Sequence, residues 1–128
     1  MSTRRIRIDT ALVQRRLAES GEAARKLIEA GAKVALATDF NPGSCPSQDL
    51  ALVGLLARLE MKMTLPEVFE AYTKNAAAAL GLEAEEGSFE VGKLANFICT
   101  DADLTDFFYS AGFTPDHQLF IRGTRLKV

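Results

Sequence analysis

A short apolar run followed by a dense loop constrains the fold of this chain more than any other feature. Residues 33–37 read Lys-Val-Ala-Leu-Ala, a run that is too short for a helix and is typical of a strand buried on both faces of a parallel sheet. Residues 38–47 then concentrate Asp, Asn, Pro, Gly and Ser so densely that they predict a loop. The sequence therefore predicts an α/β unit with a loop at the carboxyl end of a buried strand.

Helical periodicity flanks this strand and loop on both sides. Residues 10–20 and 22–30 predict an interrupted helical segment before the strand. After the loop, apolar residues recur at helical spacing over residues 48–60, and they cover so much of the surface that we expect this helix to be mostly buried. Thr64-Leu65-Pro66-Glu67 is a capping box, which predicts a further helix ending at Gly81.

From about residue 83 the pattern becomes strand-like. Residues 87–93 predict a short strand and turn, and residues 95–100 predict another strand. Residues 117–121 and 125–128 flank a turn and predict a terminal hairpin. The second half is therefore expected to be rich in β-structure.

The length limits how these parts can be assembled. A complete (β/α)8 barrel needs at least about 200 residues, so this chain of 128 residues cannot form one alone. We expect residues 1–82 to form one segment, with a helix, a strand, a loop and two helices, and residues 83–128 to form a β-rich segment. A single strand leaves both sheet edges unpaired, so something else must cover them.

Composition and charge exclude several classes of partner. Fifteen Lys and Arg against 17 Asp and Glu give a net charge of -2, which provides no positive field for nucleic acid or anionic lipid. No stretch approaches the roughly 20 apolar residues that span a bilayer, and Arg4, Arg5 and Arg7 open no signal peptide. Cys45 and Cys99 form neither a CxxC pair nor a disulfide framework, which fits a cytoplasmic protein.

The loop after the predicted strand carries the candidate chemistry. Asp39 lies just beyond the apolar run, where α/β folds direct side chains into the cleft formed by their loops. Asn41 adds an amide, Gly43 lets a ligand approach the backbone, and Ser44 adds a hydroxyl. Such a set can hold a polar substrate group beside a carboxylate that binds metal or moves a proton. Turn chemistry is the alternative, because Asp and Asn side chains also bond nearby backbone amides.

Residues 34–44, Val-Ala-Leu-Ala-Thr-Asp-Phe-Asn-Pro-Gly-Ser, resemble the final barrel strand and loop of imidazolonepropionase, in the metal-dependent amidohydrolase superfamily. Residues 73–81 and 87–96 are similar to the superfamily's last barrel helix and its return into a small β-domain. The resemblance starts near Glu22 and leaves the first twenty residues unmatched. It implies a C-terminal fragment of a (β/α)8 amidohydrolase barrel, followed by strands of a small β-sandwich domain.

The resemblance also implies a role for each loop position. Asp39 matches the last-strand aspartate, which in that family ligates zinc or iron and handles the proton of the hydrolytic water. Asn41, Gly43 and Ser44 match positions that contact substrate or product. The implied reaction opens the ring of 4-imidazolone-5-propanoate at its amide C–N bond and gives N-formimidoyl-glutamate, a step of histidine degradation.

The chain departs from that family in its histidines. The family's other metal ligands are histidines, whereas this sequence has one, His117, in the β-rich half. A mononuclear site needs about three protein ligands, so we expect the isolated chain to bind metal weakly and to be inactive. A complementary barrel fragment, or further copies of the chain, would have to complete it. Asn96 also replaces the aspartate that is usual in the family's Ala-Asp pair.

Two other functions remain open from the sequence. One is a non-catalytic remnant that folds or self-associates, and the other is an amidohydrolase of a different cyclic amide. We expect His117 to have a structural or surface role and Cys45 to be a small packing residue. The aromatic residues 107–109 are expected to form the core or the cover of the β-rich segment.

Overall fold

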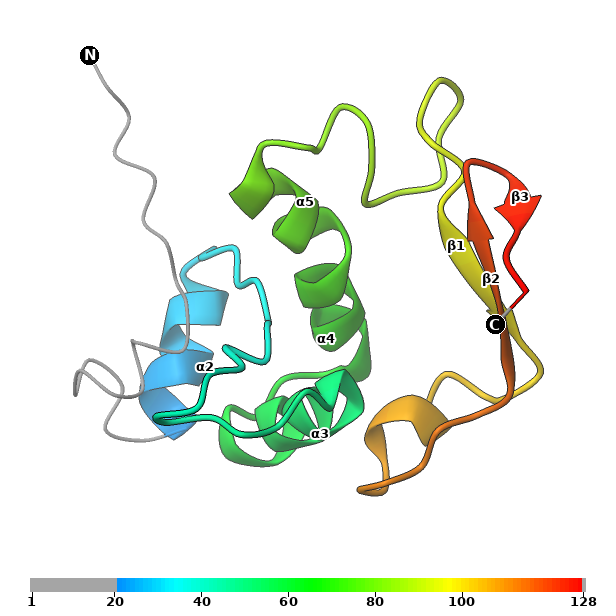
Figure 1. The fold of residues 1–128 in the computed structure, drawn as a ribbon. Helices are drawn as coiled ribbons and strands as arrows, with labels where there is room; N and C mark the ends of the chain where they lie inside the picture. Colours follow the sequence, from blue (N-terminus) through cyan, green and yellow to red (C-terminus); the bar gives the residue numbers. More distant parts are fainter. Residues whose placement is uncertain (1–20, 128) are drawn as a thin grey trace, which may run out of the picture.

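A computed structural model describes residues 21–127 of the chain. Its helices are α2 (Gly21–Glu29), α3 (Leu50–Glu60), α4 (Leu65–Tyr72), α5 (Lys74–Leu80) and the short 3-10 helix η1 (Asp106–Phe108), and its strands are β1 (Phe97–Thr100), β2 (His117–Ile121) and β3 (Thr124–Arg125). Helices α3, α4 and α5 lie between α2 on one side and the strands on the other (Figure 1). The helix predicted over residues 10–20 lies outside the described residues. No helix within residues 21–127 is long and apolar enough to cross a membrane.

The core lies where α3 and α4 meet the extended segment before the loop. Val68 and Ala71 of α4 are fully buried, and Ala57 of α3 and Val34 of the extended segment are almost so. Met63, in the turn between the two helices, completes this group with an exposed fraction of 4%. The helical members of this group, Ala57, Val68 and Ala71, have small side chains, which lets α3 and α4 pack closely.

Phe108 of η1 attaches the β-rich half to this core. Its ring packs edge-on against Phe69, with ring centroids 5.1 Å apart, and stacks on Tyr72 at 5.6 Å. Gly54 of α3 leaves the space for the ring, because a Cβ there would lie 2.6 Å from Cε1 of Phe108. Within the predicted aromatic cluster, Phe108 is therefore core to the helices, whereas Tyr109 is 77% exposed.

The apolar run at residues 33–37 is extended but belongs to no sheet, contrary to the prediction of a parallel strand. Its main-chain groups bond to the helices instead. Leu36 N–H donates to Ala71 O at 3.2 Å, and Asn75 Nδ2 donates to Val34 O at 3.0 Å. A parallel strand needs a neighbouring strand to pair with, and residues 21–127 provide none beside this run.

The helix predicted to end at Gly81 is divided into α4 and α5. The capping box is confirmed, since Thr64 N–H donates to Glu67 at 2.8 Å and the Thr64 hydroxyl accepts from Glu67 N–H. Gly81 ends α5 with a left-handed φ of 76°, as predicted. The break falls at Thr73, whose hydroxyl donates to Phe69 O at 2.6 Å, a local bond that competes with helical geometry. The break frees the carbonyl of Ala71 to accept from Leu36.

Helix α3 is much less buried than predicted. It begins after Asp49, whose side chain accepts from Leu52 N–H, and it buries only Gly54 and Ala57. Leu56 and Leu59 are 46% and 64% exposed. One face of α3 contacts α4 and η1, while Leu56 and Leu59 stay largely uncovered by residues 21–127.

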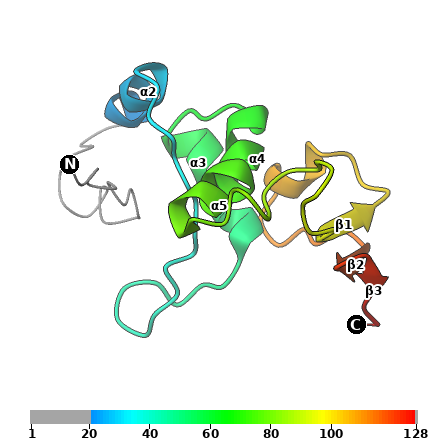
Figure 2. The same ribbon diagram turned by 90° about the horizontal axis from the view of Figure 1, so that it is seen from above.

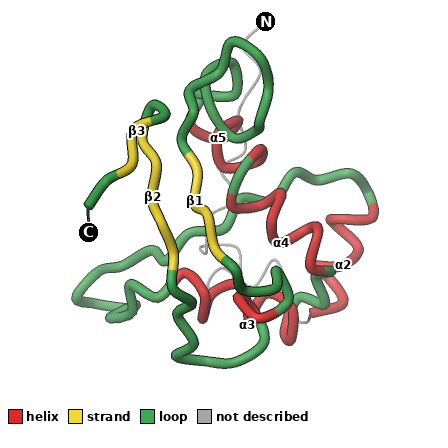
Figure 3. The backbone as a smooth tube through the Cα atoms, turned by 90° about the vertical axis from the view of Figure 1, so that its right-hand side faces the viewer, coloured by secondary structure: helices red, strands yellow, loops and turns green. Residues whose placement is uncertain are grey.

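The three strands form one antiparallel sheet in the order β1-β2-β3 (Figure 3). Phe97 of β1 is paired with Phe120 of β2, and their rings stack with centroids 4.5 Å apart. The predicted terminal hairpin is confirmed, but its second strand is Thr124–Arg125 and not residues 125–128. Its turn lies at Arg122 and Gly123, whose φ values of 50° and 75° are those that a type I′ turn requires.

The strand predicted over residues 87–93 is absent, and this segment consists of turns and bends. Gly87 and Gly92 take left-handed φ values of 87° and 97°, which a regular strand does not allow. Residues 21–127 form no second sheet, so the β-sandwich stays a prediction.

Candidate functional site

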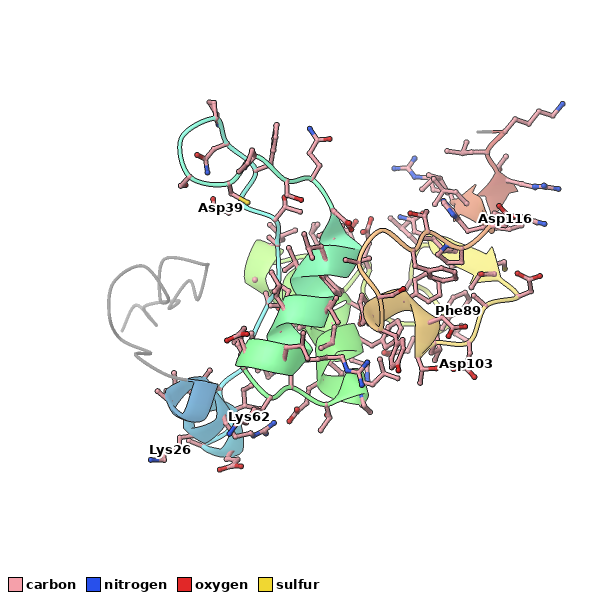
Figure 4. All side chains as sticks on the ribbon, turned by 90° about the horizontal axis from the view of Figure 1, so that it is seen from below. Lys26, Asp39, Lys62, Phe89, Asp103 and Asp116 are labelled. Atoms are coloured by element: carbon pink, nitrogen blue, oxygen red, sulfur yellow. The ribbon has the colours of Figure 1, made fainter. Side chains whose placement is uncertain are left out.

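The loop that carries Asp39 extends away from the helices. It leaves the extended run at Thr38 and returns to α3 near Asp49, and Figure 2 shows it projecting beyond α3 and α5. In Figure 4, Asp39 lies at this loop, far from the end of α2 that carries Lys26. The structure thus brings the four predicted site residues into one exposed loop.

Asp39 has an unusual backbone conformation, and its carboxylate makes no hydrogen bond to the described part of the chain. Its φ of 51° lies in the left-handed region, which Asp adopts more easily than most residues, at some cost in free energy. The side chain is exposed, and no group within residues 21–127 hydrogen-bonds to its carboxylate. Within residues 21–127, turn chemistry therefore does not describe the Asp39 side chain.

The Asn41 side chain, in contrast, is occupied by the loop itself. Its Oδ1 accepts from the N–H groups of Gly43 and Ser44 at 2.9 and 2.8 Å. Its Nδ2 donates to Asp39 O at 2.7 Å and to Ser44 Oγ at 3.1 Å. A Cβ at Gly43 would lie 3.3 Å from Asn41 Oδ1, so a small residue suits that position. Turn chemistry does describe Asn41.

Cys45 closes the loop, a role that sequence reasoning missed. Its Sγ donates to Thr38 O at 3.0 Å, and its carbonyl accepts from Asn41 N–H at 2.9 Å. The residue is half-buried. The sequence predicted only a small packing side chain, because no local pattern shows that a thiol seven positions along returns to the carbonyl that precedes Asp39.

The described residues do not make a metal site by themselves. Residues 21–127 contain no group of three or more His, Cys, Asp or Glu side chains placed to hold an ion. His117 is exposed on β2, with its Nδ1 3.0 Å from Pro115 O, which agrees with the expected structural or surface role. Asp39 alone offers one ligand, fewer than the roughly three that a mononuclear centre needs.

The strongest electrostatic contact lies far from this loop. Arg25 of α2 forms two hydrogen bonds of 2.7 Å with the Glu67 carboxylate. This guanidinium, together with the Thr64 N–H and hydroxyl, lowers the pKa of Glu67 to about 2. The pair links α2 to the first turn of α4. Arg25 Nε has no hydrogen-bond partner within residues 21–127 and lies 3.2 Å from Glu29 Oε1. Because the two-bond contact with Glu67 joins two helices, we assign it a structural role.

Comparison with known proteins identifies the family. A sequence profile described as "Amidohydrolase family" matches residues 3–126. The chain belongs to this family. The match begins at residue 3, so it includes the first residues that we could not relate to the family from the sequence. The chain is also 57% identical over 103 residues to the imidazolonepropionase of Bdellovibrio bacteriovorus and 44% identical over 101 residues to that of Fusobacterium nucleatum.

The chain spans about a quarter of these relatives. It covers 24% of the length of each of the two, although the matches cover 80% and 78% of the chain itself. The chain also matches only about a quarter of the length of similar solved structures. A zinc-bound adenosine deaminase from Xanthomonas campestris matches 80% of this chain and 27% of its own, with a TM-score of 0.69 and 26% identity. An amidohydrolase from Thermotoga maritima has a TM-score of 0.63 at 23% identity, over 84% of this chain and 26% of its own. The described residues thus have part of an α/β amidohydrolase fold.

Proposed function

We propose that this chain supplies the last part of an imidazolonepropionase active site. The reaction would be the hydrolysis of the amide C–N bond in the ring of 4-imidazolone-5-propanoate, which gives N-formimidoyl-glutamate in histidine degradation. The observation that carries the proposal is the 57% identity to the Bdellovibrio bacteriovorus enzyme over 103 residues. A match of that length includes the Asp39 loop wherever it begins in the chain.

Asp39 is the group that we propose for the chemistry. Its carboxylate is exposed and makes no hydrogen bond within residues 21–127, which leaves it able to reach a ligand or a transferable proton. It would supply one ligand to zinc or iron, and the rest of the barrel would supply the others. Gly43 and Ser44 would lie beside the substrate. Their N–H groups already bond to Asn41, so the substrate would meet a preformed loop surface.

The proposal requires a complementary piece of protein. The described residues hold no cluster of metal ligands, and the chain spans a quarter of its relatives. We therefore propose that the isolated chain is inactive and that a fragment carrying the remainder of the barrel restores activity.

Complementation tests this function. The chain is mixed with the part of the Bdellovibrio bacteriovorus enzyme that it does not match, supplied with zinc or iron, and assayed by the loss of imidazolone absorbance. We expect turnover only in the mixture, and a loss of about 100-fold or more for Asp39→Asn. Asp116→Asn, at another exposed aspartate, is the matched control. Full activity with Asp39→Asn would show that the assigned role is wrong.

A second candidate is a chain without catalytic activity. The absence of a metal-ligand group within residues 21–127 favours it. Metal analysis of the mixture separates the two, because a catalytic complex should hold stoichiometric metal and a non-catalytic one should not. A third candidate, hydrolysis of another cyclic amide, is tested by assaying the same mixture on a panel of such substrates.

A further inference from the structure

We propose that Asn41 and Cys45 are positioning residues that fix the direction of the Asp39 side chain. The inference rests on the proposed function only in taking Asp39 as the working group. It assigns Asn41 a different role from the substrate contact that the family resemblance implies, and it extends the role of Cys45 from closing the loop to fixing Asp39.

The two side chains hold the peptide groups on either side of Asp39. Cys45 Sγ donates to Thr38 O at 3.0 Å, on the peptide group that precedes the Asp39 Cα. Asn41 Nδ2 donates to Asp39 O at 2.7 Å, on the peptide group that follows it. Because each peptide group is planar, holding both leaves little freedom in φ and ψ at Asp39. The direction of its Cα–Cβ bond is then set by the loop.

The backbone of Asp39 needs this support. Its φ of 51° is left-handed, and a residue other than glycine stays in that region only where the surroundings hold it. The main-chain bond from Asn41 N–H to Cys45 O, 2.9 Å long, joins the two holding residues to each other. The loop can therefore keep Asp39 in this conformation before any other part of a barrel is present.

The Asn41 amide has little capacity left for a substrate. Its Oδ1 accepts from the main-chain N–H groups of Gly43 and Ser44, and its Nδ2 donates to Asp39 O and Ser44 Oγ. An amide offers two donors and two acceptor lone pairs, so all four positions are in use. Aspartate at this position would still accept from the main-chain N–H groups of Gly43 and Ser44. It would lose the bonds that Nδ2 donates to Asp39 O and Ser44 Oγ.

Nuclear magnetic resonance of the whole chain tests the structural half of the proposal. The three-bond HN–Hα coupling and the Cα and carbonyl shifts of Asp39 report its φ. We expect the left-handed signature to be lost in Cys45→Ala and in Asn41→Asp, and to persist in Cys45→Ser, which keeps a donor. Cys99→Ala, at the exposed cysteine of β1, is the matched control. Unchanged Val68 and Ala71 signals show that each variant is folded. An unchanged Asp39 signature in both disruptive variants would overturn the proposal.

Kinetics of the complemented enzyme test the functional half. A misplaced catalytic group lowers turnover, so we expect Cys45→Ala to reduce kcat by about 10- to 100-fold while KM changes less than about twofold. Cys45→Ser should restore most of kcat. A rise in KM with kcat unchanged would overturn the assignment, because it would indicate a substrate contact. If the unsubstituted chain restores no activity at all, the proposed function fails, while the resonance experiment still decides the positioning role.

Discussion

Asn96 joins two segments that are far apart in the sequence. Its Nδ2 donates to Glu86 Oε1 at 3.1 Å, and its Oδ1 accepts from Arg122 N–H at 2.8 Å. The amide therefore connects the residues before β1 to the turn of the terminal hairpin. An aspartate, usual here in the family that the sequence resembles, could accept from Arg122 but could not donate to Glu86.

We expect Asn96→Asp to destabilise the chain at neutral pH. It would place two carboxylates at hydrogen-bonding distance and lose one bond, at a cost of about 1 kcal/mol in the free energy of unfolding. The loss in the free energy of unfolding should be smaller at pH 3, where the two carboxyl groups can share a proton. Urea unfolding of variant and parent at both pH values checks this, with Asn96→Ala as the uncharged control. An equal loss at the two pH values would contradict the expected repulsion.

Glu67 predicts a second pH dependence. The Arg25 guanidinium, with the groups of Thr64, holds the folded-state pKa of Glu67 at about 2, against an ordinary value of 4.5. A lowered carboxyl pKa stabilises the fold above the ordinary value, and this stabilisation is lost as pH falls from about 4.5 towards 2. We expect Glu67→Gln to flatten this part of the stability profile. The control is Glu83→Gln, at an exposed glutamate. A profile as steep as that of the parent would show that the Arg25 contact is not formed.

At the scale of elements, the packing of α3 against η1 depends on one missing side chain. The Phe108 ring occupies the space beside Gly54. Gly54→Ala would gain about 1 kcal/mol in helix propensity, and overpacking of a core costs about 1–3 kcal/mol. Since the ring is buried and the new Cβ would overlap it, we expect net destabilisation in urea unfolding. Adding Phe108→Leu to Gly54→Ala should recover part of the lost unfolding free energy. If the effects of the two substitutions simply added, the Gly54 position would not be in direct contact with Phe108.

Local signals in the sequence predicted the elements that depend on neighbouring residues. The Thr64 capping box, the end of α5 at Gly81 and the terminal hairpin are each determined within a few positions, and all three are confirmed. The break at Thr73 and the pairing of residues 33–37 were not predictable. The placement of residues 33–37 depends on hydrogen bonds between positions 35 and 41 apart, for which periodicity carries no signal, and the break depends on a side-chain bond from Thr73 to Phe69 O that helical periodicity does not show.

The sequence likewise predicted one part of the candidate site and not the other. That Asp39 lies in a loop after an extended run follows from the order of residues. Turn chemistry at Asn41 was foreseen as an alternative and is observed. The bonds from Asn41 and Cys45 to the peptide groups beside Asp39 could not be predicted, because no local pattern indicates the left-handed backbone at Asp39.

At the scale of the whole molecule, the described chain exposes an apolar surface on α3. Leu56 and Leu59, about one turn apart on the same side of α3, are 46% and 64% exposed. Large exposed apolar patches are uncommon on monomeric proteins and mark contact surfaces. The sequence led us to expect self-association or a complementary fragment, and this surface supports that proposal.

We expect the isolated chain to self-associate through α3. Burying a leucine stabilises a contact by about 1.5–3 kcal/mol, so Leu56→Lys combined with Leu59→Lys should raise the dissociation constant at least about tenfold. Sedimentation equilibrium measures this. Leu104→Lys, at a leucine 56% exposed but outside α3, is the control. Equal effects of the control and the double variant would show that association does not use α3.

The break between α4 and α5 has a consequence for how such a sequence can diverge. The run that leads to Asp39 is attached to the helices through the main chain of Ala71 and Leu36 and through one amide, that of Asn75. Every residue except proline provides the same main-chain N–H and C=O groups. The outward faces of both helices can therefore accumulate substitutions without displacing the run, whereas replacing Asn75 would release one of its two anchors.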